Sequence, residues 1–162
     1  MKFLIKNIKL ILLIIFISNF FTLNKLISQE LIINQNLSFG TFAPSISTTN
    51  VIVYPNGSRS IVGNAIPLGL FNYSPAIFTY TSKKGKSKDI VHIIYEHNIL
   101  IINNSYSMSV KLGPSNKHDD RYRTEPNTAT EIKLGGILTI KSINQNPSGT
   151  YVGTFFITII QE

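Results

Sequence analysis

The sequence contains no cysteine, which excludes disulfide-bonded scaffolds, zinc sites with thiolate ligands, iron–sulfur clusters and cysteine nucleophiles. Charged residues are also scarce, at 14% of the 162 residues, whereas hydrophobic residues make up 43%. This balance is typical of a chain with a packed core and argues against intrinsic disorder. A chain of this length has room for one domain of ordinary size.

The sequence also lacks a hydrophobic run long enough to cross a membrane as a helix. The most apolar run, LILLIIFI at residues 10–17, is well short of the roughly 20 residues that a membrane-spanning helix needs. It follows Lys2, Lys6 and Lys9 and precedes small and polar residues around Ser28. This order is typical of a secretory signal peptide. The competing interpretation is an N-terminal membrane anchor, which the short run disfavours.

We therefore predict a signal peptide at residues 1–28 and a single domain at residues 29–162, with no membrane span in the mature chain. The domain is expected to be exported to the periplasm, the cell surface or the medium of a Gram-negative-type bacterium. Without a cysteine after the apolar run, a lipid anchor is excluded. Cleavage removes four of the 15 basic residues and none of the 8 acidic ones, so the net charge falls from +7 to +3. The basic full-length chain is thus no ground for a nucleic-acid partner.

After residue 28 no stretch keeps apolar residues at helical spacing for three turns. Short runs rich in Ile, Val, Thr, Tyr and Phe alternate with clusters of Gly, Pro, Asn and Ser, including PNG at residues 55–57 and NPSG at residues 146–149. Many short strands without helices predict an all-β, antiparallel sandwich or barrel. The predicted strands cover residues 31–36, 37–42, 50–54, 60–67, 76–82, 89–96, 99–102, 106–112, 130–134, 136–143 and 150–160.

Two parts of this predicted chain can be described in more detail: the C-terminal strand and a pair of glycines. In residues 150–160 one alternating set is almost wholly apolar and should face the core, and without a proline the strand could lie centrally in a sheet. The inward set is Tyr151, Gly153, Phe155, Ile157 and Ile159. The pair Gly135 and Gly136, between two predicted strands, indicates a bend where one backbone passes close to another.

Five segments in order carry a family resemblance: LSFG at 37–40, YPNGSR at 54–59, SPAIF at 74–78, GGILTI at 135–140 and NPSGTYVGTF at 146–155. Together they resemble the secreted bacterial family called domain of unknown function 4402, over nearly all of the mature chain. Each motif alone is only a turn followed by a strand. The C-terminal strand is also similar to the closing strand of spore-coat-U-like and chaperone–usher pilin domains.

The pilin-like resemblance implies an antiparallel immunoglobulin-like β-sandwich that assembles by strand exchange. The family brings no catalytic residues to carry over. The sequence departs from the family pattern at residues 93–102 and 117–125, which are longer and more idiosyncratic, and at the basic segment 83–88.

The histidines do not suggest a metal site. His92 and His97 are five residues apart, which places them on opposite faces of a strand. His118 precedes two aspartates, but a calcium loop needs several oxygen ligands at alternating positions and a glycine turn. Arg121 and Arg123 follow at once and neutralise those acids. We therefore expect no metal and no other cofactor.

No catalytic constellation is visible either. The chain has no G-x-S-x-G elbow and no S-x-x-K motif around a serine. Glu96, Glu125 and Glu131 stand in no glycosidase signature, and the glycine pair at 135–136 is not followed by a lysine-capped helix that would bind phosphate. The protein is therefore predicted not to be an enzyme.

The most concentrated charge lies in one short basic segment. Lys83, Lys84, Lys86 and Lys88 could attract an acidic polymer. The alternative, which we favour, is a hairpin loop whose lysines deter edge pairing. Arg59, just after the turn at 55–57, is expected to hold that turn and to have a structural role.

Two functional hypotheses follow. The first is an exported, non-enzymatic structural or surface-assembly subunit, pilin-like, that binds itself or related subunits by strand addition. Its candidate donor is ELIINQN at residues 30–36, and if this segment pairs within its own sheet the molecule should be a self-contained monomer. The second is a monomeric extracellular module that binds an acidic surface polymer, such as a polysaccharide, through the four lysines with Tyr80 and Tyr95.

Overall fold

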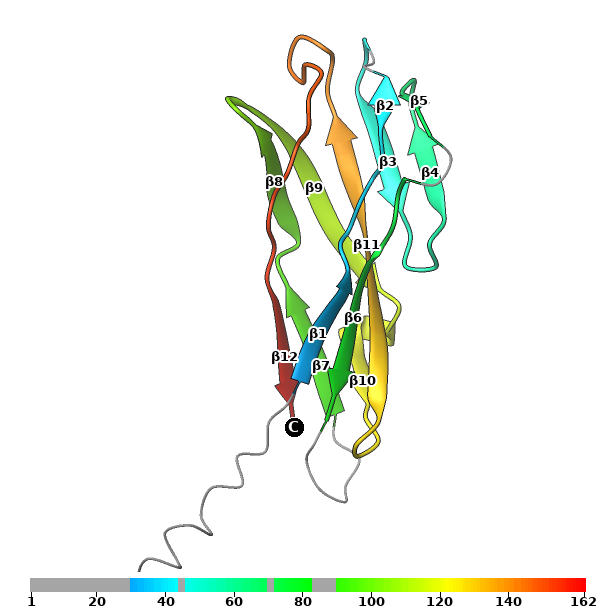
Figure 1. Cartoon of the computed structure of the whole chain (residues 1–162), viewed down its shortest axis with the longest axis vertical. Coiled ribbons are helices and arrows are strands. Elements are labelled where there is room, and N and C mark those ends of the chain that lie inside the picture. Colours follow the sequence, from blue (N-terminus) through cyan, green and yellow to red (C-terminus); the bar gives the residue numbers. More distant parts are fainter. Residues whose placement is uncertain (1–29, 44–45, 70–71, 83–89) are drawn as a thin grey trace, which may run out of the picture.

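A computed structural model describes residues 30–43, 46–69, 72–82 and 90–162 (Figure 1). The predicted signal peptide, residues 1–28, and the four lysines of the basic segment lie outside these residues. The described chain consists of β-strands and one short 3₁₀ helix, and it holds no helix that is long and apolar enough to cross a membrane. The elements are β1 (Glu30–Gln35), β2 (Phe42–Ala43), β3 (Thr49–Val53), β4 (Arg59–Val62), β5 (Ile66–Pro67), β6 (Ala76–Thr81), β7 (Ile90–Tyr95), β8 (Asn98–Asn103), β9 (Tyr106–Ser115), η1 (His118–Asp120), β10 (Arg121–Arg123), β11 (Ala129–Ile140) and β12 (Ile157–Gln161).

The strands form three antiparallel sheets. The largest has the order β1-β6-β11-β3-β4, and β9 joins it through β11 and carries β8 on its other side. The second has the order β10-β7-β12, and the third is the short pair β2-β5. Every strand pair in the described residues is antiparallel, which confirms the predicted all-β, antiparallel class.

The two larger sheets face each other across one hydrophobic core. Its buried side chains come mainly from β3, β6, β7, β9 and β11, where alternate residues turn inward as strand geometry requires. Between the sheets, the rings of Phe78 and Phe155 meet edge to face at 6.3 Å. The hydroxyl of Tyr80 donates a hydrogen bond of 2.8 Å to Oε1 of Gln161. The end of β12 therefore contacts β6.

The longest strand, β11, organises the larger sheet. Its first half pairs with β6, and its second half pairs with β3 on one side and β9 on the other. The sequence predicted two strands here with a bend at Gly135, and that prediction is wrong because β11 runs through without interruption. The irregularity at the glycine pair is instead a shift in the register of β11 against β9, between Leu134 and Gly136. The predicted close approach is confirmed, since a Cβ at Gly135 would overlap the carbonyl oxygen of Val53.

The C-terminal strand is shorter than predicted. Only β12 pairs regularly, preceded by one bridge between Ile102 and Val152, because its partner β7 ends at Tyr95. The predicted alternation is confirmed from residue 154 on: Phe155, Ile157 and Ile159 pack against the core, whereas Thr154, Phe156, Thr158 and Ile160 are exposed. It is wrong for Gly153, which is exposed although it was expected to face the core. The predicted central position is wrong, since within the described residues β12 is the edge strand of its sheet.

Two other predicted strands are interrupted by glycines. The segment 37–42 forms only a bridge from Ser38 to Ser74 before β2, because Gly40 has a φ of 94° that a strand cannot contain. The segment 60–67 is divided into β4 and β5 by Gly63, whose φ is 125°. The break at Gly40 lies beside the guanidinium of Arg59, whose contacts are described below.

Candidate functional site

Tyr80 and Tyr95 do not line any surface site. Tyr80 is 1% exposed, and its hydroxyl is used in the bond to Gln161. Tyr95 is 9% exposed, and its hydroxyl donates a 2.8 Å hydrogen bond to Oδ2 of Asp120. Both side chains stand at core-facing positions, because alternate residues of β6 and β7 turn inward. Composition alone did not reveal this direction. The predicted polymer site of lysines and tyrosines therefore loses its two aromatic members.

Asp120, one of the two acids after His118, serves the structure. Its carboxylate accepts from the Tyr95 hydroxyl and, at 3.3 Å, from the backbone N–H of Ser115. Burial raises the pKa of Tyr95 well above its ordinary value, and the hydrogen bond to Asp120 and the charge of its carboxylate act in the same direction. The Tyr95 phenol therefore stays neutral and continues to donate. This segment therefore ties β9 to β7.

His92 and His97 make separate contacts in the structure. Nε2 of His92, in β7, lies 3.5 Å from a carboxylate oxygen of Glu162. The ring of His97 packs edge to face on Tyr95, with centroids 5.2 Å apart. Across the part of the chain that the structure describes, no three His, Cys, Asp or Glu residues gather as metal ligands.

Arg59 has a structural role, as the sequence indicated, but its guanidinium contacts other parts of the chain and not the turn at 55–57 that it was expected to hold. Its guanidinium donates to the carbonyl oxygens of Phe39 and Gly69, each at 3.3 Å. The same group lies 4.2 Å from the ring centroid of Tyr73 and 5.5 Å from that of Phe42. Arg59 thus joins the start of β4 to two other parts of the chain, one containing Phe39 and Phe42 and the other containing Gly69 and Tyr73.

The outer edge of β12 presents unpaired backbone groups. Ile90 and Glu162 exchange both of their backbone hydrogen bonds, at 3.2 and 2.9 Å. Because such pairs alternate along an antiparallel ladder, the N–H and C=O groups of Ile157 and Ile159 point away from β7. No described strand pairs with this side of β12. Its sequence ITIIQ contains no charge and no proline, the usual devices that keep an edge from pairing.

The opposite edge strand, β1, is apolar and incompletely covered. Leu31 pairs with Tyr80 and Ile33 with Phe78, and partners across a ladder point to the same face of the sheet. Both partners are buried, so Leu31 and Ile33 also face the core side, yet they are 39% and 66% exposed. Among the described residues no strand pairs with the outer edge of β12, and we call the position beside that edge the vacant strand position.

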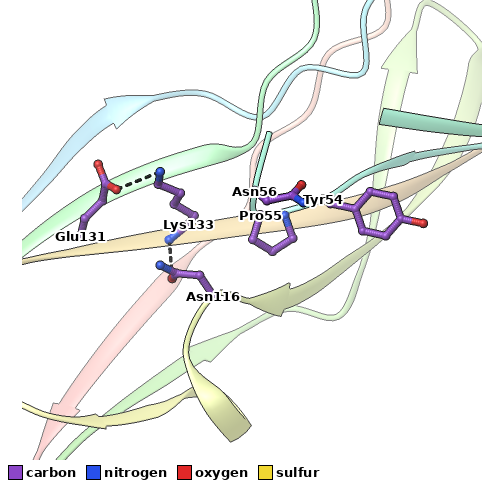
Figure 2. Close-up of a pocket in the computed structure, with 6 residues that line it drawn as sticks. All are labelled: Tyr54, Pro55, Asn56, Asn116, Glu131 and Lys133. Carbon is purple, nitrogen blue, oxygen red and sulfur yellow. Dashed lines mark hydrogen bonds and ion pairs between the residues drawn. The ribbon is translucent and has the colours of Figure 1, made fainter. Parts of the chain in front are cut away.

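A shallow groove lies elsewhere on the larger sheet, with a volume of about 490 Å³ (Figure 2). It is formed by the turn after β3, by the residue after β9 and by β11. In Figure 2 Tyr54 lies at one end and Glu131 and Lys133 lie at the other. The lining residues are Tyr54, Pro55, Asn56, Asn116, Glu131 and Lys133.

The polar groups of this groove are held in place by the backbone. Oδ1 of Asn116 accepts from the N–H of Lys133 at 2.8 Å, and Oδ1 of Asn56 accepts from the N–H of Ser58 at 2.9 Å. The Lys133 ammonium lies 3.0 Å from the Glu131 carboxylate. From the sequence, Glu131 was considered only as a catalytic acid, and the groove was not predicted. The one sequence signal for the groove was the YPNGSR turn, which precedes β4 and places Tyr54 at the surface.

These observations define a small all-β domain with antiparallel sheets, whose described residues include an apolar edge strand, β12, and a shallow groove. The family described as domain of unknown function (DUF4402) matches residues 31–160, and the chain belongs to this family. The resemblance inferred from the five motifs is thereby confirmed, whereas the more distant likeness to pilin domains stays a prediction. No curated protein and no solved structure gives a significant match.

Proposed function

We propose that this protein is an exported, non-enzymatic structural or surface-assembly subunit whose domain, an immunoglobulin-like sandwich behind a cleaved signal peptide, binds other subunits by strand addition. The observation that carries the proposal is the free edge of β12. Strand addition uses the backbone groups of an exposed edge for affinity and the alternating side chains for specificity. An edge with outward-facing groups at Ile157 and Ile159 provides both.

The predicted donor segment, residues 30–36, already pairs with a strand of its own chain in the structure. Within the chain β1 pairs with β6 through most of its length, which by itself favours a self-contained monomer. The side chains of Leu31 and Ile33 nevertheless remain 39% and 66% exposed, and water exposure of apolar area costs free energy. Because β1 is already paired, the acceptor role belongs to β12, whose outer edge no described strand occupies.

A proline at position 159 tests the proposal. The Ile159 N–H points away from β7, so Ile159→Pro removes no hydrogen bond within the chain, and proline is tolerated at such edge positions. Ile159→Ala is the matched control, because it also removes the isoleucine side chain but keeps the N–H. We expect Ile159→Pro to weaken subunit association at least about tenfold relative to Ile159→Ala, the equivalent of 1.4 kcal/mol.

Association is measured by light scattering on the purified exported protein over a wide concentration range. Thermal unfolding of both variants verifies that they fold to a similar extent. Equal association of the proline and alanine variants, or a wild-type protein that stays monomeric at every concentration, would contradict strand addition at β12.

A second candidate function is a monomeric binding module for a surface polymer, and the groove is the observation that favours it. The oxygens of Asn56 and Asn116 are engaged with the backbone, so their amide N–H groups are oriented as donors. Glu131 neutralises Lys133, so the groove favours a neutral, hydroxyl-rich chain over an acidic one. The exposed ring of Tyr54 supplies an apolar surface.

This candidate predicts a loss of binding when the ring is removed. Tyr54→Ala should weaken binding of neutral oligosaccharides at least about tenfold, whereas Tyr54→Phe, which keeps the ring, should change it about twofold or less. The measurement is calorimetric titration with a panel of neutral and uronic-acid oligosaccharides. Binding confined to the acidic members, or unaffected by Tyr54→Ala, would reject the groove as the site.

A further inference from the structure

The turn between β3 and β4 contains the one Asn-Gly pair of the sequence, Asn56 followed by Gly57. Both residues are exposed, and Asn56 lines the shallow groove (Figure 2). In such a pair the backbone nitrogen can attack the side-chain amide, because glycine has no Cβ to shield that nitrogen. The surroundings of Gly57 add no obstruction, since apart from its chain neighbours an added Cβ would meet nothing within 4 Å.

The side chain of Asn56 is folded back over this peptide bond. Its Oδ1 accepts a hydrogen bond of 2.9 Å from the N–H of Ser58, two residues further on, which is an Asx turn. The ring of atoms that this hydrogen bond closes contains both Cγ of Asn56 and the backbone nitrogen of Gly57. The turn therefore holds the electrophile and the nucleophile of the attack close together.

Ser58 also prepares the amide for attack. Its hydroxyl donates a second hydrogen bond, of 2.7 Å, to the same Oδ1 of Asn56. When a nitrogen adds to Cγ, negative charge develops on Oδ1, and donors that already point at this oxygen stabilise that charge. The bond that must open first runs from the Gly57 N–H to the Tyr54 carbonyl, at 2.9 Å, and backbone hydrogen bonds in exposed turns open locally.

We propose that Asn56 is a site of intramolecular deamidation, and that Ser58 stabilises the reacting oxygen. The Gly57 nitrogen loses its proton to a solvent base and forms a bond to Cγ, and the Cγ–Nδ2 bond breaks as ammonia leaves with a proton from solvent. Water then opens the resulting cyclic imide. Breaking the bond from the Gly57 nitrogen to Cγ gives aspartate, and breaking its bond to the main-chain carbonyl carbon gives isoaspartate. The sum consumes one water and releases one ammonia, without oxidation or reduction.

Either product changes the groove and the turn. A carboxylate has no N–H, so the donor that the Asn56 amide offers to the groove is replaced by a negative charge. Isoaspartate also adds Cβ to the main chain, in a turn that is closed by bonds of 2.9 Å from Tyr54 to Ser58 and from Gly57 to Tyr54. The reaction thus alters this surface with the age of the molecule, and it depends on neither of the functions proposed above.

Peptide mass spectrometry of the purified exported protein, incubated at neutral pH, tests the site. We expect position 56 to exchange its amide for an acid at least about tenfold faster than Asn104, an exposed asparagine in the turn after β8 that is followed by a serine. Isoaspartate should be the main product, and hydroxylamine, which captures cyclic imides, should cleave the chain after residue 56. An amide that persists as long at position 56 as at position 104, or aspartate without isoaspartate, would overturn the proposal.

A pair of variants tests the contribution of Ser58. Ser58→Ala removes the hydroxyl donor and should slow the reaction about threefold or more, whereas Ser58→Thr keeps both donors and should change the rate about twofold or less. In guanidinium chloride the turn is unfolded and these hydrogen bonds are absent, so Ser58→Ala should react there as fast as the wild-type chain. An alanine effect of the same size in both states, or a faster reaction of Ser58→Ala in the folded state, would overturn the role of Ser58.

Discussion

Replacing Gly135 by alanine is expected to lower the free energy of unfolding by about 3 kcal/mol or more. A Cβ at this position would overlap the carbonyl oxygen of Val53 and would lie 3.0 Å from Cδ of Pro55. The carbonyl belongs to the backbone of β3, so relief requires the turn at residues 54–58 or β11 itself to move. Changes of this kind are among the few that exceed the usual cost of about 1 kcal/mol for a point substitution.

The neighbouring glycine supplies the control for this prediction. A Cβ at Gly136 would lie 3.3 Å from Cδ2 of Leu37 and 3.3 Å from Cζ of Phe39, two side chains that can yield, and 3.3 Å from the carbonyl oxygen of Lys111. Gly136→Ala should therefore cost clearly less than Gly135→Ala. Both are measured by urea denaturation of the purified domain. A Gly135→Ala loss no greater than that of Gly136→Ala would show that β3 does not constrain position 135.

The second large effect is expected for Arg59→Ala, which should lower the free energy of unfolding by about 2 to 4 kcal/mol. The substitution removes two charged hydrogen bonds to carbonyls and two cation–π contacts of about 0.5 to 1 kcal/mol each. Both hydrogen bonds are long, at 3.3 Å, so each is expected to contribute about 0.5 to 1 kcal/mol. The carbonyls of Phe39 and Gly69 would lose their donor.

Arg59→Lys distinguishes geometry from charge. A lysine keeps the cation but presents a compact ammonium, which cannot reach both carbonyls while stacking on Tyr73. It should recover about half of the loss or less. Chemical denaturation of both variants provides the comparison. Full rescue by lysine would mean that charge alone accounts for the role of Arg59.

The sequence was most informative where local chemistry decides the structure. Period-two alternation placed Phe155, Ile157 and Ile159 correctly toward the core, and the glycine pair at 135–136 indicated a close backbone approach. Where tertiary partners decide, it was wrong. The length of β12 depends on where β7 ends at Tyr95, and the continuity of β11 depends on a change of neighbours that no local pattern records.

The candidate sites were less predictable than the fold. Tyr80 and Tyr95 appear in the sequence as aromatic residues near a basic segment, but the inward direction of each follows from strand register. The groove combines residues of three segments between positions 54 and 133, so no motif contains it. The vacant strand position lies at the edge of an assembled sheet, and only that sheet reveals it.

The position of β11 in the chain has a consequence for the order of folding during synthesis. Residues 129–140 provide the pairing that joins β6, β3 and β9 into one sheet. A nascent chain shorter than this holds only separate pairs, such as β3 with β4 and β8 with β9, and isolated hairpins are marginal in water. Four-fifths of the polypeptide therefore leaves the ribosome before a cooperative core can close, and the whole domain folds as one late event.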